Sequence, residues 1–211
     1  MMRFVAFLLP FIIAFAALAP AGSAQVLLNE ILADPASDWD NDGSVSSKLD
    51  EWVEVINAGA IAVDLADYRL SDTSAGTSFR FALTGALAPG ATRVFYGAEV
   101  VAWQTANGVS AYGLSLNNGG DTVSLYRIAG VDTSVTDSYS YVTAQVADDR
   151  AVGRLPDGAA LWVIFDALNA YSGSDFPVAS GCRPSPGITA GCPTPAELSS
   201  WGRVKAQYSS K

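Results

Sequence analysis

Residues 38–57 read DWDNDGSVSSKLDEWVEVIN, and this stretch joins the densest acidic cluster of the chain to one of its clearest strands. The strand is predicted over residues 51–57, where Glu51 and Glu54 interrupt a run of apolar residues. We expect both glutamates to face water or the acidic loop. The rest of the chain is predicted to form a β scaffold around the junction between the acidic loop and the strand at residues 51–57.

The same short-strand pattern recurs on both sides of the join. Alternating or wholly apolar runs predict further strands at residues 26–33, 61–66, 79–83, 92–97, 112–116, 121–128, 135–142, 151–155 and 161–165. Turn signals such as Pro89-Gly90 and Asn117-Asn118-Gly119-Gly120 separate them. One short helix is expected over residues 99–106. Short strands with turns about every 8–12 residues predict an all-β fold, an antiparallel sandwich or barrel.

The first 24 residues have the order of a secretory signal peptide. Arg3 is followed by an apolar run over residues 4–18 and by small residues that place Gly22 and Ala24 at the −3 and −1 positions of a cleavage site. An uncleaved membrane anchor is the alternative, but the apolar run is short for a bilayer span. We therefore expect a secreted, periplasmic or cell-surface protein with no membrane span after signal cleavage.

Residues 25–166 are predicted to form the β-sandwich domain, and residues 167–211 a Pro/Gly-rich C-terminal extension. Cys182 and Cys192 are the two cysteines, and such a pair in an exported chain predicts a disulfide that pins the extension. Two free thiols or a metal-binding pair remain the alternatives. The chain has no histidine, which excludes His-based triads and imidazole zinc sites. Its net charge of −9 disfavours a nucleic-acid partner.

Several pieces of the chain, in order, carry a family resemblance. These are LLNEILADP, an acidic insert, DEWVEVINAGAIAVDLADYRLSD, LAPGATRVFYG, LSLNNGGDTVSLYRIAGVDTSVTDSYSY and RAVGRLPDG with a tryptophan after it. Over residues 25–165 the chain resembles the lamin-tail domain of exported bacterial proteins, and residues 184–187 (Pro-Ser-Pro-Gly) resemble the family's closing motif. The resemblance implies an immunoglobulin-like β sandwich used as a non-catalytic module. Lamin-tail domains of animal lamins bind partner proteins and chromatin, and bacterial ones are often joined to secreted hydrolases or surface proteins.

The acidic half of residues 38–57 has the spacing of half a calcium loop. Asp38, Asp40 and Asp42 occupy alternate positions before a glycine, so their carboxylates can converge on one hard cation. Ser44 would offer its carbonyl at the seventh position. The twelfth position lacks the usual glutamate, and Asp50 follows one residue late. We predict a structural Ca²⁺ site from these five residues, with a solvated loop held by Asx-turns as the alternative.

Two other groups of residues are weaker candidates. Glu30, Glu51 and Glu54 offer a carboxylate pair for glycoside hydrolysis, although alternating glutamates on strands are more often an exposed face. A sugar-stacking platform is the second candidate, and it would use Trp39, Tyr112, Tyr139 and Tyr141. Such aromatics are more often half-buried cross-strand pairs. Trp52 and Trp162 are expected in the core.

The function predicted from these residues and the resemblance is an exported, non-catalytic binding or structural module. Its partner is expected to be a protein or a cell-surface polysaccharide. A carbohydrate-binding module is the first alternative, and an exposed coplanar aromatic row would mark it. A calcium-dependent secreted hydrolase is the second, and a pocket with two convergent carboxylates would mark it.

Overall fold

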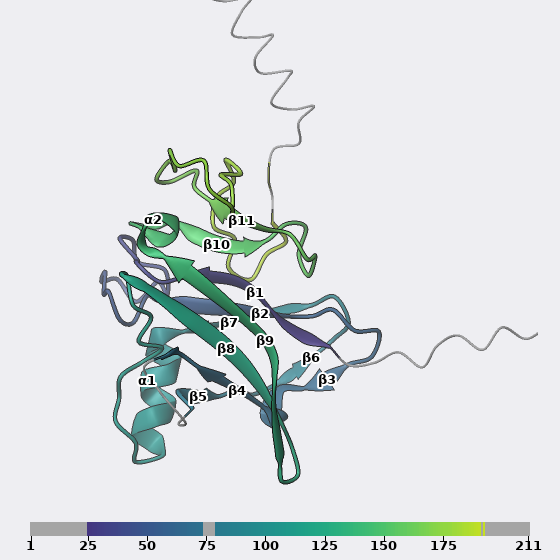
Figure 1. Cartoon of the computed structure of the whole chain (residues 1–211). Helices are drawn as coiled ribbons and strands as arrows, with labels where there is room; N and C mark the ends of the chain where they lie inside the picture. Colours follow the sequence, from purple (N-terminus) through teal and green to yellow (C-terminus); the bar gives the residue numbers. More distant parts are fainter. Residues whose placement is uncertain (1–24, 74–78, 191, 193–211) are drawn as a thin grey trace, which may run out of the picture.

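The computed structural model describes residues 25–73, 79–190 and 192. The predicted signal peptide and residues 193–211 lie outside this part of the chain. Within it, antiparallel strands form two main sheets (Figure 1). The first sheet has the order β11-β10-β1-β2-β7, from β1 (Val26–Leu32), β2 (Trp52–Asn57), β7 (Thr92–Tyr96), β10 (Ala151–Arg154) and β11 (Trp162–Phe165).

The second sheet has the order β5-β4-β8-β9, from β4 (Tyr68–Ser71), β5 (Phe81–Ala82), β8 (Gly120–Ala129) and β9 (Asp132–Val142). A small ribbon pairs β3 (Val63–Asp64) with β6 (Ala86–Leu87). The helical elements are η1 (Leu65–Asp67), α1 (Gly97–Ala106) and α2 (Thr143–Val146). No helix among the described residues is long and apolar enough to cross a bilayer.

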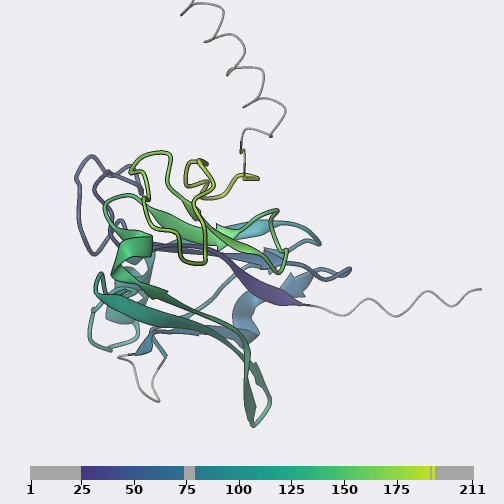
Figure 2. The same cartoon turned by 45° about the horizontal axis from the view of Figure 1, so that its top comes forward.

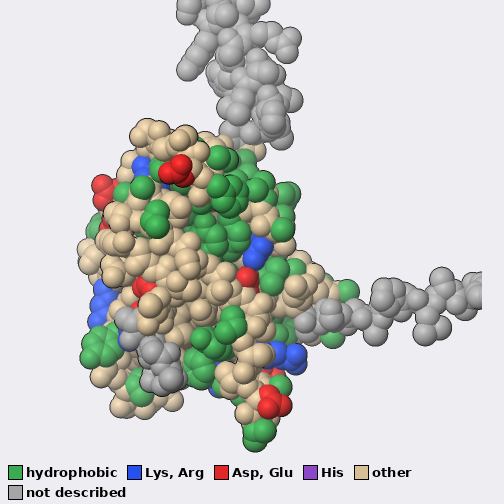
Figure 3. Space-filling model, in the orientation of Figure 1, with side chains coloured by type: hydrophobic (Ala, Val, Ile, Leu, Met, Phe, Trp, Pro, Cys, Tyr) green, Lys and Arg blue, Asp and Glu red, His purple; other side chains and the backbone are tan. Residues whose placement is uncertain are grey.

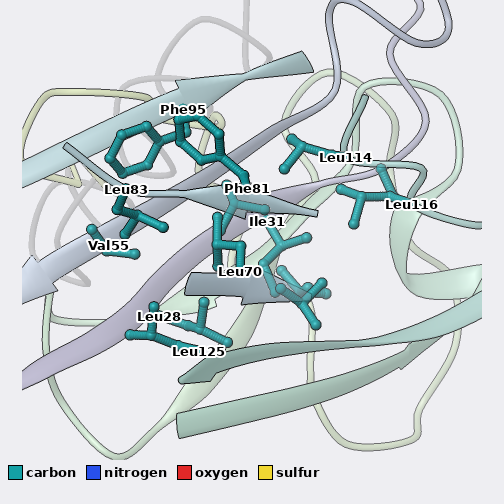
Figure 4. Close-up of a cluster of buried hydrophobic side chains, with 14 of the residues drawn as sticks. Leu28, Ile31, Val55, Leu70, Phe81, Leu83, Phe95, Leu114, Leu116 and Leu125 are labelled. Carbon is teal, nitrogen blue, oxygen red and sulfur yellow. The ribbon is translucent and has the colours of Figure 1, made fainter. Parts of the chain in front are cut away.

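The two main sheets pack face to face over one apolar core. Inward-facing residues of the first sheet, such as Leu28, Val55 and Phe95, meet residues of the second sheet, such as Leu70 and Leu125 (Figure 4). All five are buried. Strands contribute alternate residues to this core, as the pleat requires, except in β1, where a register shift between Leu28 and Glu30 makes Ile31 the next core residue after Leu28. The predicted antiparallel β sandwich is therefore confirmed.

The outer face of the first sheet is covered as well. A second apolar cluster lies there, made of Leu32, Trp52, Val94, Ala151, Val163, Phe165 and Cys182. The segment after β11 runs back over this face (Figure 2) and pairs with β11, where the amide of Ile164 donates to the carbonyl of Val178 at 2.9 Å. The loop between β1 and β2 adds the half-buried ring of Trp39. As a result, β2 is buried at every position, on both faces.

Two of the predicted strands are not formed as expected. Residues 112–116 do not pair as a strand, because the side chain of Gln104 takes both backbone groups of Gly113, at 2.8 Å to its amide and 3.0 Å to its carbonyl. Of residues 61–66, β3 covers Val63–Asp64, and the chain then turns into η1. The helix expected over residues 99–106 is present as α1.

The structure contains the predicted disulfide between Cys182 and Cys192, with the two Cα atoms 4.8 Å apart. Reducing this bond is expected to lower the free energy of unfolding by about 3 kcal/mol, because an open loop gives the unfolded chain more conformations. Urea unfolding with and without a thiol-free reductant measures the effect. A Cys182→Ser, Cys192→Ser double variant is the control, since reductant should leave its unfolding midpoint unchanged. An equal midpoint for the oxidised and fully reduced wild type would contradict the prediction.

Candidate functional site

The acidic loop joins β1 to β2 and brings three predicted ligands together. Carboxylate oxygens of Asp38, Asp40 and Asp42 all lie within 4.8 Å of one another. Their side chains also shape the loop, since the amide of Gly43 donates to Asp38 at 2.9 Å and the amide of Ser44 donates to Asp42 at 2.8 Å. These are Asx-type bonds of the kind that turns use. The three-carboxylate geometry expected from the spacing is therefore formed.

Asp50 stands apart from this cluster and has another role. Its side chain is buried, and one carboxylate oxygen accepts the amides of Trp39 at 2.6 Å and Asp40 at 3.0 Å. The other oxygen accepts the amide of Ser46 at 2.7 Å. Asp50 thus links residues 39–40 to residue 46 from inside the loop. Ser44, the fifth predicted ligand, is exposed on the loop.

Trp39 fastens the loop to the sandwich. Its indole nitrogen donates to Asp149 at 2.7 Å, and its ring meets Trp52 edge to face with centroids 5.9 Å apart. Asp149 also accepts the amides of Ala36 and Ser37 and the Ser37 hydroxyl. Burial acts to raise the pKa of Asp149, but these hydrogen bonds outweigh it, and the pKa is lowered. An ionised Asp149 therefore anchors the start of the loop.

The carboxylates of the loop repel one another. Loss of hydration raises the pKa of Asp40, and the nearby charges of Asp42, Asp50 and Asp38 raise it further, while a hydrogen bond from the Asp42 amide opposes them. A bound cation would remove this repulsion and favour the ionised form. Oxygen ligands at this separation suit a hard cation such as Ca²⁺. The three carboxylates thus have the spacing and the ligand type of a candidate cation site.

The expectation that Glu54 faces water was wrong, and Glu30 is buried beside it. The two residues are directly opposite each other on β2 and β1, on the outer face of the sheet. The amide and hydroxyl of Ser185 donate to Glu30, the hydroxyl at 2.9 Å, and the amide of Gly187 donates to Glu54 at 2.7 Å. Both donors come from the Pro184–Gly187 stretch, so the segment after β11 covers the pair. Strand alternation predicts the outward direction of these glutamates but not their cover.

The ionisation of these two glutamates follows from that cover. Burial raises the pKa of Glu30 well above its usual value, the Ser185 hydrogen bonds oppose it, and the charge of Glu54 adds to it. Burial also raises the pKa of Glu54, against hydrogen bonds from Asn29 and Gly187. The Asn29 amide nitrogen lies 2.6 Å from Glu54. A carboxylate pair covered in this way offers no open site for glycoside cleavage.

Glu51 is also buried and does not face water, but its cavity is lined in part by Ser47 and Lys48 of the acidic loop, which was the other expected environment. This cavity lies on the far side of β2 from Glu30 and Glu54. There the Glu51 carboxylate accepts the amide of Leu116 at 3.3 Å. Burial raises the pKa of Glu51 to about 8, against amide hydrogen bonds from Leu116 and Ser115. The charges of Asp72 and Asp121 raise it further. Nothing in the local sequence around Glu51 indicates this cavity, because its other walls come from distant segments.

The four aromatic candidates do not form a coplanar row. Trp39 packs on Trp52, as described above, and Tyr139 stacks on Trp162 with centroids 3.8 Å apart. Tyr141 is buried, whereas Tyr112 is exposed. The side chains of Trp52 and Trp162 are buried as expected. The stacking platform is therefore not formed, and the contact of Tyr139 with Trp162 runs between the two sheets and is not a cross-strand pair.

Comparisons with known proteins place the chain in a family. The model of the Lamin Tail Domain matches residues 19–143, more than half of the chain. The matched segment ends one residue after β9, so that β10, β11 and the covering segment lie beyond it. No curated protein and no solved structure shows significant similarity to the chain. The antiparallel sandwich and the family match agree: the chain belongs to the lamin tail domain family.

Proposed function

We propose that this protein is an exported binding or structural module of the lamin-tail type, without enzymatic activity and with a calcium-stabilised loop. Membership of the lamin tail domain family is the observation that carries the proposal. Two of the three glutamates considered for glycoside hydrolysis support the non-catalytic part, since Glu30 and Glu54 are covered by residues 185–187. The disulfide is compatible with an oxidising, extracytoplasmic location.

The expected partner is a protein or a cell-surface polysaccharide. Nucleic acid is disfavoured by the net charge of −9, since phosphates would be repelled. On the face shown in Figure 3, basic side chains are scattered and do not gather in one patch. Protein and polysaccharide fractions of the native envelope, passed over immobilised residues 25–211, test this role. Saturable retention that free protein competes away supports it, and the absence of any saturable retention contradicts it.

Calcium is expected to raise the thermal stability of the protein. Asp38, Asp40 and Asp42 would gain a cation that offsets their repulsion, and a site of the extracellular class has a Kd of about 10⁻⁴–10⁻³ M. At about 10 mM calcium and a Kd of about 1 mM, linkage gives about 1.4 kcal/mol. For a chain of this size, that amounts to about 3–6 °C in Tm. Thermal melting during a calcium titration measures the shift.

The matched variants separate a specific site from general salt effects. In the Asp40→Asn, Asp42→Asn variant the side chains can still accept the loop amides, but the calcium-dependent rise in Tm should disappear. Asp132→Asn, a change at an exposed aspartate at the start of β9, should leave the rise unchanged. An unchanged wild-type Tm at about 10 mM calcium would remove the calcium site from the proposal.

A further inference from the structure

A cavity of about 780 Å³ opens on the far side of the strand from the covered glutamates. Its walls come from residues 47–51, from residues 112–122, and from the paired ends of β8 and β9. Its volume is typical of small-molecule sites, which hold about 300–1,000 Å³. Serine, threonine and asparagine side chains line it, together with the carboxyl groups of Glu51 and Asp121.

An unpartnered buried hydroxyl belongs to this cavity. Tyr141 lines it and is 3% exposed, and its hydroxyl lies near the Asn117 amide but makes no hydrogen bond of normal geometry within the described residues. The charges of Asp121 and Glu51 act on this hydroxyl, so it lies near the acidic side chains of the cavity wall. A buried polar group without a full hydrogen bond is unfavourable, and a hydrogen bond to a ligand oxygen in the cavity would offset this cost.

The polar wall beside Tyr141 is held in place before any ligand arrives. The Asp121 carboxylate accepts the amides of Thr122 at 2.7 Å, Thr73 at 3.1 Å and Asn117 at 3.2 Å. The hydroxyls of Thr122 and Ser140 also line the cavity and lie 2.7 Å apart, but they belong to the next cross-strand pair and therefore to the other face of the β8–β9 pair. A carboxyl group fixed as that of Asp121 is pre-organised, which lowers the entropy cost of binding.

The lining restricts the class of ligand. An anion would meet the carboxylate of Asp121, and the basic residue of the wall, Lys48, already donates its ammonium group to the carbonyl of Ala111. A metal ion finds no converging carboxylates, since the acidic groups close enough for one among the described residues are those of Asp38–Asp42. An apolar ligand would strip water from many hydroxyl and amide groups without replacing their hydrogen bonds. A neutral, hydroxyl-rich molecule matches both the donors and the acceptors.

An exposed aromatic ring lies at the same cavity. Tyr112 is 58% exposed, and the guanidinium carbon of Arg80 lies 5.4 Å from the centre of its ring. A ring so placed can cover the apolar face of a sugar while the wall binds its hydroxyls. We propose that this cavity binds a neutral saccharide unit, with Tyr112 stacking on the sugar and the Tyr141 hydroxyl and Asp121 binding its oxygens. The inference deepens the binding role proposed above by naming a ligand class and a site.

The test uses residues 25–211 and four neutral disaccharides: cellobiose, maltose, lactose and N,N′-diacetylchitobiose. Each is titrated while amide NMR shifts are followed, with glucuronate as an anionic probe and calcium as a cationic one. At least one disaccharide should shift amides of residues 115–122 and 140–141 in a saturable way, and glucuronate should not. Calcium should act on residues 38–50 instead.

Two variants identify the residues that bind. Tyr141→Phe keeps the ring and removes the hydroxyl, so we expect about 3–10-fold weaker binding, as for one lost hydrogen bond. Tyr112→Ala, at an exposed ring, should weaken binding to a similar degree. Tyr139→Phe, two residues away on β9 with its ring on Trp162, is the matched control and should bind as the wild type does.

Saturable shifts confined to other surfaces, equal binding by Tyr141→Phe, or no saturable shift with any of the four disaccharides would overturn the proposal. None of these results would contradict the module role, because a protein retained from the envelope would still support it. Cleavage of a bound disaccharide would support the saccharide site and contradict the non-catalytic part of the proposed function. The two proposals therefore fail separately.

Discussion

A chain that ends at Asp166 is expected to lose about 5 kcal/mol of stability, because the segment it lacks covers the outer face of the first sheet. Leu32, Trp52 and Phe165 are almost fully buried in the outer cluster. Exposing about three large apolar side chains at about 1.5–3 kcal/mol each gives a loss of this size. Total stabilities of domains are about 5–15 kcal/mol, so the shortened chain should be marginal at best. Urea unfolding followed by tryptophan fluorescence measures the change.

Milder changes keep this prediction testable if the shortened chain does not fold. Ser185→Ala removes the hydroxyl that donates to Glu30 at 2.9 Å and should cost about 1–3 kcal/mol, since a buried carboxyl loses a partner. Ser174→Ala, at an exposed position of the same segment, should cost less than about 0.5 kcal/mol. A chain that ends at Cys192 separates the described segment from the residues after it. Wild-type stability in both the Asp166-ended chain and Ser185→Ala would show that the segment contributes nothing.

Glu51→Gln is expected to reduce the loss of stability between about pH 5 and about pH 8 by about 3–4 kcal/mol. Burial raises the pKa of Glu51 from 4.5 to about 8, so between these values the folded chain keeps a proton that the unfolded chain has released. Stability must then fall as pH rises through this range. At about 1.4 kcal/mol per pH unit, the total approaches 5 kcal/mol, of which about 3–4 kcal/mol falls between about pH 5 and pH 8.

The raised pKa values of Glu30 and Glu54 act in the same direction, so the variant should keep a smaller fall. The measurement is urea unfolding at about pH 5 and about pH 8, in a chelator, so that the neighbouring acidic loop carries no metal. Glu99→Gln is the control, because Glu99 pairs with Arg93 near the surface of α1. Its fall should match that of the wild type. The prediction fails if Glu51→Gln and wild type lose the same free energy over this pH range.

The fold itself could be predicted largely from local sequence. Alternating residues at 92–96 and 120–129 form β7 and β8, and the asparagine–glycine run at 117–120 turns the chain into β8. Local sequence patterns suffice here because successive residues of a half-buried strand alternate between the core and solvent, so apolar and polar residues alternate in the sequence. They fail at residues 112–116, because the Gln104 side chain replaces a neighbouring strand. A hydrogen bond from nine residues away leaves no periodic signal.

The candidate cation site was predictable for the same local reason. The carboxylates of Asp38, Asp40 and Asp42 converge because alternate positions of a tight loop point inward, and the spacing alone carries that information. Asp50 shows the limit of such reasoning. Its nearness in sequence predicts a ligand, but its buried carboxylate is occupied by three loop amides. Competition between backbone amides and a cation depends on the folded loop and not on spacing.

From the sequence alone, the strand over residues 51–57, its buried Trp52 and the acidic loop before it could be predicted, because each depends on neighbours in the chain. The environment of its glutamates was decided by the tertiary structure. Glu54 lies under residues 185–187, and Glu51 lies at a cavity whose walls include residues 115–122 and 140–141. Strand periodicity determines which face a side chain occupies, but long-range packing determines what covers that face. The hydration of a carboxyl group, and with it the pKa, follows from that cover.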